Sequence, residues 1–212
     1  YTSGTTGLPK GVMIEHKGVI NYLIFLKCSV IYEEIHDAVL FLVNYTFDVS
    51  VEHIMLSLFN DLSLIVVRSE KIYFNSDIYD YLNKYKVSYI SSTPTQLLNL
   101  DLSSLKFLKQ LSISGESFTL KVLKDVRNHY KNIIINAYGP TEATIINFMF
   151  IYNRETNFKN SLGKTVFNIK FYVLNKNYQL IPIGAIGELY IGGIGVARGY
   201  LNRPDLTAEK FI

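Results

Sequence analysis

The chain has 212 residues, of which 49% are hydrophobic and 18% are charged, and its 21 basic and 18 acidic residues give a formal charge of +3. This length and apolar content predict a globular chain with a sizeable core, and they exclude a disordered or fibrous protein. The small charge excludes a nucleic-acid partner, because that polymer is bound by a basic face or stripe.

Short apolar runs alternate with segments of helical periodicity up to residue 138. The expected strands are residues 12–14, 38–43, 62–67, 87–91, 110–114 and 133–137. The expected helices are residues 15–32, 51–59 with Ser50 as N-cap, 77–85, 94–100 and 120–130. The apolar face of the first helix is expected at Val19, Ile20, Leu23, Leu26 and Val30. Apolar strands that alternate with helices indicate a mostly parallel sheet covered on both faces.

Beyond residue 140 the segments become shorter and more extended. Residues 167–174, 178–181 and 188–191 have the pattern of antiparallel strands, and 175–177 form a turn between the first two. The sequence therefore predicts an α/β fold of mostly parallel sheets flanked by helices, followed by a smaller antiparallel β-rich subdomain. The polar stretch 153–161 is the expected boundary, which gives parts 1–152 and 153–212.

No segment predicts a membrane span or a signal peptide, so no membrane partner is expected. The most apolar run, 19–31, is interrupted by polar residues and is shorter than the ~20 residues that cross a bilayer. The single cysteine, Cys28, excludes a disulfide framework, fits the reducing cytoplasm and is expected in the core. Both ends have the features of cut ends, because the first residue is not methionine and the last residues lie in a predicted helix. We therefore expect a fragment of a larger protein.

The strongest local motif is TSGTTGLPKG at residues 2–11. Backbone N–H groups and hydroxyls packed this closely can converge on phosphate oxygens, and Lys10 adds positive charge. It is not a Walker loop, in which Gly-Lys is followed directly by Ser or Thr. A plain turn rich in Ser, Thr and Gly remains the alternative. The residues expected to hold phosphate are Thr2, Ser3, Gly4, Thr5, Thr6, Gly7 and Lys10.

A second motif, NAYGPTE at residues 136–142, follows an apolar strand. In open parallel sheets, ligands bind at the carboxyl ends of the strands. Tyr138 supplies a flat face for a base and Asn136 an amide for its edge. Thr141 can hydrogen-bond phosphate, and Glu142 is an oxygen ligand suited to Mg²⁺. A Gly-Pro turn with a surface glutamate remains the alternative.

Four blocks, in order and spacing, resemble the adenylate-forming enzymes, which include acyl-CoA synthetases, luciferases and the adenylation domains of nonribosomal peptide synthetases. They are residues 2–11, FDVS at 47–50, residues 136–142, and GELYIGGIGVARGYLNRPDLTAEKF at 187–211. The last block is typical of peptide synthetases in particular. The resemblance implies an AMP-forming ligase that uses ATP and Mg²⁺ to activate an amino acid. It also implies thioester transfer to phosphopantetheine on a carrier domain, with condensation domains in the same synthetase.

The resemblance assigns roles to individual residues. Catalytic roles fall to Lys10, Thr141 and Glu142, and Glu142 is the metal ligand. Besides residues 2–7 and Lys10, the ATP contacts are Gly115, Glu116, Asn136, Ala137, Tyr138, Gly139 and Thr141. A plain turn at Gly115 and Glu116 remains an alternative. The ribose-binding aspartate block and the catalytic lysine of the family lie outside these residues, so we expect the 212 residues alone not to turn over.

The resemblance also assigns a substrate pocket, formed by Asp48, Val49, Glu52, Ser91, Ser112, Ser114, Ala137, Ile145 and Ile146. Asp48 is expected to pair with a substrate α-ammonium, and its alternative is a helix N-terminal carboxylate. A second carboxylate one turn later, Glu52, favours an ornithine-, lysine- or arginine-like substrate, with a polar uncharged amino acid next. A solvent-facing Glu52 remains the alternative.

Two rival functions remain. One is a stand-alone adenylate-forming ligase that loads D-alanine or an aryl acid onto a carrier, or an acyl-CoA ligase. The other is a non-catalytic nucleotide-binding module.

The four histidines are scattered along the chain, which indicates surface or packing roles for them. They are His16, His36, His53 and His129.

Overall fold

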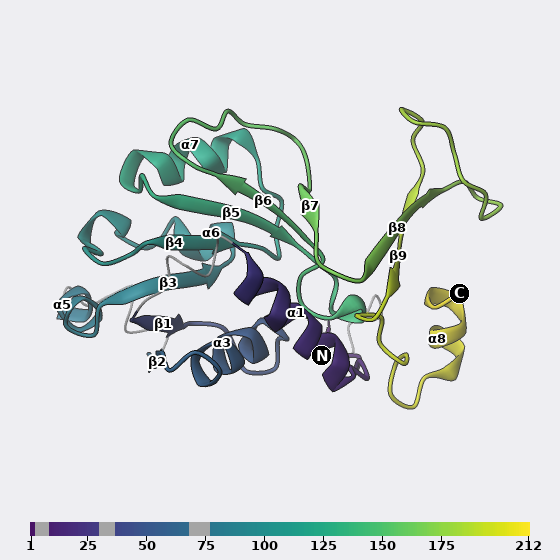
Figure 1. Ribbon diagram of the computed structural model, residues 1–212, viewed down its shortest axis with the longest axis horizontal. Coiled ribbons are helices and arrows are strands. Elements are labelled where there is room, and N and C mark those ends of the chain that lie inside the picture. Colours follow the sequence, from purple (N-terminus) through teal and green to yellow (C-terminus); the bar gives the residue numbers. More distant parts are fainter. Residues whose placement is uncertain (3–8, 30–36, 68–76) are drawn as a thin grey trace.

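The computed structural model describes residues 1–2, 9–29, 37–67 and 77–212 (Figure 1). The centre of the fold is a seven-stranded sheet of order β2-β1-β3-β4-β5-β6-β7. Its strands are β1 (Ala38–Phe41), β2 (Ser63–Val66), β3 (Val87–Ser92), β4 (Gln110–Ile113), β5 (Ile133–Tyr138), β6 (Phe148–Tyr152) and β7 (Lys164–Thr165). Strands β1 to β5 run parallel, whereas β6 and β7 pair antiparallel at one edge.

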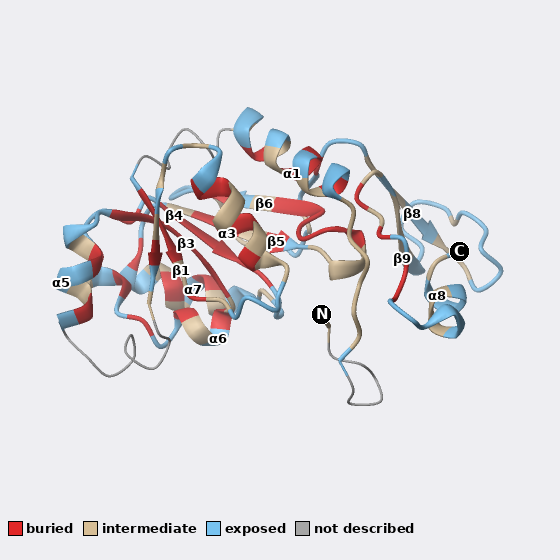
Figure 2. Ribbon diagram, turned by 90° about the horizontal axis from the view of Figure 1, so that it is seen from below, coloured by how far each residue is buried: buried red, intermediate tan, exposed pale blue. Residues whose placement is uncertain are grey.

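Helices cover both faces of this sheet, as the pattern predicts. The helices are α1 (His16–Cys28), α3 (Val49–Leu58), α5 (Asp77–Lys84), α6 (Pro94–Leu97), α7 (Leu120–His129) and α8 (Pro204–Lys210). Two short 3-10 helices lie between these elements, η1 (Leu102–Ser104) before β4 and η2 (Thr141–Ala143) after β5. Figure 2 shows α1 and α3 on one face and α5, α6 and α7 on the other.

The strands are apolar on both faces because two separate cores pack against them. Val39 and Tyr89 belong to the core under α1 and α3. Leu40 and Ile90, their neighbours in sequence, belong to the core under α5, α6 and α7. Side chains alternate between the faces of a strand, so a doubly covered sheet requires this continuous apolar pattern.

A second, two-stranded antiparallel sheet follows, formed by β8 (Ile169–Leu174) and β9 (Glu188–Gly193). It stands apart from the large sheet in Figure 1, with α8 beside it. This arrangement confirms the predicted fold class. Among the described residues, none of the helices has the length and apolar character needed to cross a membrane.

Several local predictions are wrong. Residues 12–14 form no strand of a sheet, and Val12 makes a single bridge to Tyr200. Residues 178–181 likewise contribute one bridge, from Leu180 to Leu174. The helix α3 begins at Val49 with Asp48 as N-cap, so Ser50 lies inside its first turn. Strands β6 and β7 were not predicted, because they follow a Gly-Pro turn and depend on tertiary pairing, of β6 with β5 and of β7 with β6.

Helix α1 buries only part of the face that its apolar residues predict. Leu26 is buried and Val19 and Leu23 are half-buried, and Val30 lies outside the described residues. Its buried residues are Gly18, Asn21, Tyr22 and Leu26, whereas Ile20 is exposed. The helix also packs closely at Gly18, where an added Cβ would lie 2.8 Å from the Thr144 hydroxyl oxygen. Cys28, expected in the core, is exposed at the end of the helix, because the buried stripe ends at Leu26.

Candidate functional site

The carboxyl ends of the parallel strands open onto two adjoining cavities of about 590 Å³ and about 400 Å³. The loops that follow β4 and β5 separate them, and Gly115, Glu116 and Gly139 border both. This is the edge at which parallel α/β sheets bind ligands. The two cavities therefore form one candidate site with two compartments.

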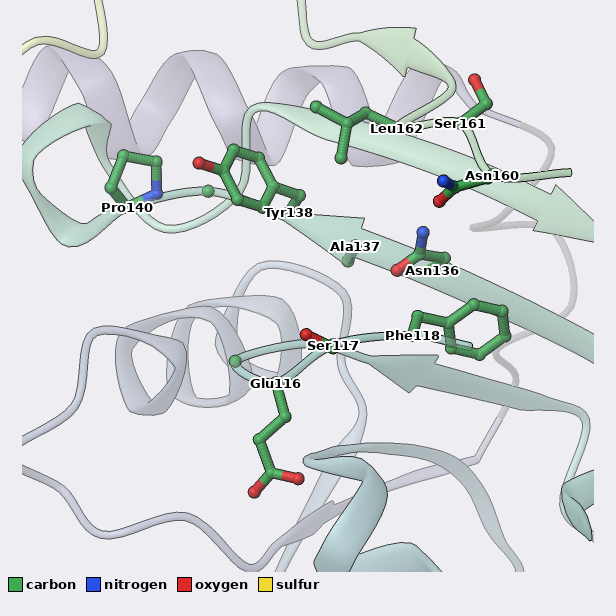
Figure 3. Close-up of a pocket in the computed structure, with 12 residues that line it drawn as sticks. Glu116, Ser117, Phe118, Asn136, Ala137, Tyr138, Pro140, Asn160, Ser161 and Leu162 are labelled. Carbon is green, nitrogen blue, oxygen red and sulfur yellow. The ribbon is translucent and has the colours of Figure 1, made fainter. Parts of the chain in front are cut away.

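The larger cavity is lined by polar and aromatic side chains. Its lining residues are Gly115, Glu116, Ser117, Phe118, Asn136, Ala137, Tyr138, Gly139, Pro140, Asn160, Ser161 and Leu162. Figure 3 shows Asn136 and Phe118 on facing sides, with Glu116 pointing away from both. Aromatic faces beside an amide suit a flat heterocyclic base.

Glu116 points away from this cavity because its carboxylate is hydrogen-bonded elsewhere. The backbone N–H and the hydroxyl of Thr95 donate to Glu116 Oε2 at 3.2 and 2.7 Å. The hydroxyl of Thr95 lowers the pKa of Glu116. Glu116 thus anchors the loop after β4 to α6, and Gly115 gives that loop its positive φ of 80°.

The smaller cavity is acidic. It is lined by Val43, Asn44, Phe47, Asp48, Val49, Ser92, Thr93, Gln96, Ser114, Gly115, Glu116, Gly139, Thr141, Ile145 and Ile146. This set contains two carboxylates and, in the described part of the chain, no basic side chain. A ligand with a positive charge matches this lining.

Asp48 has one carboxylate oxygen in the smaller cavity that lacks a partner. Its Oδ2 atom is buried without a hydrogen-bond partner among the described residues. Burial raises the pKa of Asp48, while the Thr141 hydroxyl and the backbone N–H groups of Val49 and Ile145 oppose the rise. A buried carboxylate oxygen without a partner is costly, and an ammonium group would satisfy it.

The wall formed by Ile145 has an unusual backbone. Thr144 and Ile145 have φ values of 66° and 63°, in the left-handed region that β-branched residues avoid. Surrounding bonds hold this conformation: the Thr144 hydroxyl donates to Gly195 O at 2.5 Å, and Asn147 N donates to Tyr138 O at 2.8 Å. A strained backbone conformation that is held in place by surrounding contacts is typical of ligand sites. No signal in the sequence indicates it.

Glu52 lies behind the smaller cavity and does not line it. The residue is 1% exposed, so the solvent-facing alternative is wrong. The hydroxyls of Tyr22 and Tyr89 donate to its two oxygens at 2.7 and 2.6 Å. Burial raises the pKa of Glu52, and these hydrogen bonds oppose the rise. Ser91 and Ser112 are also buried, and their hydroxyls contact Tyr89 rather than the cavity.

Lys10 and Glu142 meet at Tyr200, a residue that sequence reasoning missed. The hydroxyl of Tyr200 donates to Glu142 Oε1 at 2.5 Å, and the Lys10 Nζ atom lies 4.5 Å from the ring centroid. Burial and the Glu142 carboxylate raise the pKa of Tyr200, so its hydroxyl keeps the proton that it donates.

Of the predicted phosphate loop, the structure describes only the two ends. Thr2 pairs with Lys10 through two backbone hydrogen bonds of 3.0 and 2.9 Å. The predicted phosphate contacts Ser3, Gly4, Thr5, Thr6 and Gly7 lie outside the described residues.

Glu142 fits the Mg²⁺ expected from the resemblance. The described residues contain no cluster of three or more His, Cys, Asp or Glu side chains that could hold a metal ion. Mg²⁺ is usually bound through one or two carboxylates together with substrate phosphates and water. Tyr200 engages Oε1 of Glu142, so Oε2 is the oxygen that such an ion would contact.

The structure therefore brings most of the predicted residues to one edge of the sheet. Gly115, Glu116, Asn136, Ala137, Tyr138 and Gly139 border the larger cavity, and Asp48, Val49, Ser114, Thr141, Ile145 and Ile146 border the smaller one. Glu52, Ser91 and Ser112 form a second layer behind it. Reasoning from sequence missed the tyrosines that bind the glutamates, Tyr22, Tyr89 and Tyr200, and several lining residues, among them Phe118, Gln96 and Asn44.

A mostly parallel sheet with one compartment for a flat base and one acidic compartment defines a nucleotide-binding α/β class of protein. Within that class, the model of the family described as AMP-binding enzyme matches residues 1–201, and the chain belongs to this family.

Similar proteins place the chain more narrowly. It is 39% identical over 215 residues to N-(5-amino-5-carboxypentanoyl)-L-cysteinyl-D-valine synthase of Penicillium rubens, and 42% identical over 214 residues to the synthase of that name from Amycolatopsis lactamdurans. Each match covers 100% of this chain and 6% of the relative, so the chain spans a small part of these proteins. A crystal structure of holo-AB3403, a four-domain nonribosomal peptide synthetase bound to AMP and glycine, superposes with a TM-score of 0.79 and 28% identity. That match covers 94% of this chain and 15% of the other.

Proposed function

We propose that this chain is part of an adenylation domain of a nonribosomal peptide synthetase and activates an amino acid with ATP. The observation that carries the proposal is Asp48, whose buried, unpartnered Oδ2 borders a cavity with no described basic side chain. An amino acid brings the α-ammonium that such a carboxylate requires, whereas a fatty or aryl acid does not. The relatives named above, which are synthases of peptides, support the same substrate class.

The reaction joins the ligands of the two compartments. The carboxylate of the amino acid attacks the α-phosphorus of ATP, the bond to the β-phosphate oxygen breaks, and pyrophosphate leaves. Tyr138 and Asn136 orient the base, Asp48 orients the amino acid, and Thr141 borders the smaller compartment beside Asp48. Lys10 neutralises phosphate charge, and Mg²⁺ held by Glu142 supplies further charge neutralisation when bound. Catalysis here is mainly positioning and electrostatic stabilisation.

The second half-reaction requires partners. The aminoacyl adenylate passes its acyl group to the thiol of phosphopantetheine on a carrier domain, which releases AMP. Carrier and condensation domains of the same synthetase are the partners we propose, since the four-domain synthetase has a similar fold over 94% of this chain. The single cysteine fits a reducing compartment, and we propose the cytoplasm.

The side chain of the substrate faces polar groups at the inner end of the acidic cavity. Behind that end lies Glu52, whose two tyrosine partners occupy only part of the acceptor capacity of a carboxylate. We propose a substrate with a cationic side chain, ornithine-, lysine- or arginine-like, that is attracted by the carboxylate of Glu52 behind the lining. A polar uncharged amino acid that bonds to Gln96 or Asn44 is the next choice.

Amino-acid-dependent exchange of pyrophosphate into ATP tests the proposal in the full-length protein. We expect exchange with at least one amino acid from a complete panel and the highest kcat/KM with a basic one. Asp48→Asn removes a charge-assisted bond worth about 1.5–3 kcal/mol, so kcat/KM for the amino acid should fall about 10- to 100-fold. The KM for ATP should not change.

Asp80→Asn, on the exposed face of α5, is the control and should match the unmodified protein. Exchange driven by aryl or fatty acids alone would overturn the amino-acid proposal and favour a stand-alone ligase. Preference for a large apolar amino acid would overturn only the side-chain proposal.

A further inference from the structure

Tyr200 lies where three segments far apart in the sequence meet. Its backbone forms an antiparallel bridge with Val12, two residues after Lys10, and Leu201 N donates to Gly11 O at 2.8 Å. Tyr200 is 4% exposed, and its ring packs edge-on against Phe211 with 5.5 Å between the centroids. The position of the ring is therefore fixed by the backbone contacts with residues 11–12 and by the packing against Phe211.

Two opposite charges converge on this one side chain. Lys10 Nζ lies 4.5 Å from the ring centroid, a cation–π contact, while the hydroxyl donates to Glu142 Oε1 at 2.5 Å. The loop that carries Glu142 is tied to the same region, because Ala197 N donates to Glu142 O at 2.8 Å. In the described part of the chain, no ion pair joins Lys10 to Glu142.

We propose that Tyr200 is a positioning residue that keeps Lys10 and Glu142 apart and aims both at the phosphates of the nucleotide. This inference rests on the proposed function. Without the phenol between them, Lys10 and Glu142 would attract each other and pair directly, since opposite charges near a protein surface attract by several kcal/mol at about 4 Å. Paired, neither would be available for phosphate or for a metal ion.

The hydroxyl has a separate effect on Glu142. It engages Oε1 only, so the carboxylate presents Oε2 as a single ligand atom in a fixed direction. Hydrogen bonds to a metal-binding carboxylate orient it, and their loss typically weakens metal binding about 10- to 100-fold. The ring and the hydroxyl of Tyr200 thus have different tasks, which substitutions can separate.

ATP binding to the full-length protein, measured by calorimetry with varied Mg²⁺ and also in EDTA, separates these tasks from a structural role. Tyr200→Phe keeps the ring and removes the hydroxyl. It should raise the Mg²⁺ concentration at half-saturation about 10- to 100-fold and leave ATP affinity in EDTA unchanged. Tyr200→Leu removes the ring as well and should also weaken ATP binding in EDTA, because Lys10 then pairs with Glu142.

Two variants make the result specific. Glu142→Gln in the Tyr200→Leu background should restore ATP affinity in EDTA, because Lys10 loses its competing partner. Tyr190→Phe removes a comparable but exposed hydrogen bond, from Tyr190 to Glu188 Oε2 at 3.2 Å, and should behave like the unmodified protein. A purely structural role for Tyr200 predicts equal losses with and without Mg²⁺ and no rescue.

The outcomes distinguish this inference from the proposed function. An unmodified protein that does not bind ATP overturns both. If the unmodified protein binds ATP and Tyr200→Phe has the same Mg²⁺ dependence, only the proposed role of the hydroxyl is overturned. If Tyr200→Phe does not fold, Tyr200→Leu with and without Glu142→Gln decides the role of the ring, and absence of rescue overturns it.

Discussion

His53 is a buried base that should make the domain sensitive to acid. It lies on α3, is 0% exposed, and neither ring nitrogen has a hydrogen-bond partner among the described residues. Its ring is enclosed edge-on by Phe41 and Tyr89, with centroids 5.8 and 6.2 Å away. Burial lowers the pKa of His53 to about 4. His53→Phe replaces the imidazole with an apolar ring that can make the same edge-on contacts.

The size of the effect follows from proton linkage. In the unfolded chain a histidine has a pKa of about 6.5, so between about pH 6.5 and 4 the unfolded state binds a proton that the folded state does not. Falling pH therefore favours unfolding. Between pH 7.5 and 5.0 this group alone should remove about 2 kcal/mol of stability. Glu52, whose pKa is raised by burial, has the opposite sign, but its contribution is present with and without His53 and cancels in the comparison.

Urea unfolding at pH 7.5 and 5.0, followed by hydrogen exchange of the α3 amides, measures this difference in the full-length protein. The stability lost between the two pH values should be about 2 kcal/mol smaller in His53→Phe than in the unmodified protein. His129→Gln, at an exposed position on α7, should retain the loss of the unmodified protein. If His53→Phe loses as much stability as the unmodified protein, the imidazole is not neutral in the folded state and the reasoning is wrong.

Two further perturbations probe the groups around the site. Tyr22→Phe and Tyr89→Phe each remove a donor from buried Glu52 and should lower the free energy of unfolding at pH 7.5 by about 1.5–3 kcal/mol, as measured by urea titration. In a Glu52→Gln background the loss should shrink to about 0.5–1.5 kcal/mol, and an equal loss in both backgrounds would contradict an ionised Glu52. Gly139→Ala places a Cβ 2.4 Å from Ile145 O, so it should cost about 1–3 kcal/mol and raise the KM for the amino acid. Gly192→Ala, whose nearest neighbour would be 3.7 Å away, is the control, and similar effects of both would refute a packing role for Gly139.

The large sheet was predictable because local and tertiary preferences agree there. The expected strand 87–91 is β3 with one residue added, and the expected helix 77–85 is α5 with one residue removed. Strand β7 was not predictable, since it has only two residues and exists through pairing with β6. The burial of Gly18 and Asn21 in α1 was not predictable either, because it depends on partners far away in the sequence. Gly18 packs closely beside Thr144, and Asn21 donates a hydrogen bond to Phe167 O.

The candidate site divides in the same way. Motifs contiguous in sequence, such as residues 136–142, indicated the groups at the strand ends, because a motif carries its own spacing. The tyrosines that hold the two buried or half-buried glutamates were invisible, since 30, 37 and 58 residues separate the partners. The sequence pattern predicts that a tyrosine in an apolar segment is a core residue. Only the fold shows that its hydroxyl binds a carboxylate.

Two carboxylates near this edge of the sheet, Glu52 and Glu142, are held by tyrosine hydroxyls, and no ion pair to either is found among the described residues. A lysine or arginine beside Glu52 or Glu142 would neutralise the charge that an amino acid or a metal ion is meant to meet. A phenol donates one hydrogen bond and adds no charge, so it fixes the carboxylate and leaves its field in place. Asp48 has no tyrosine partner, and its Oδ2 atom is buried at the cavity wall without a hydrogen bond among the described residues. The three acidic groups thus differ in how much they are satisfied, and the least satisfied one is where a ligand cation binds most favourably.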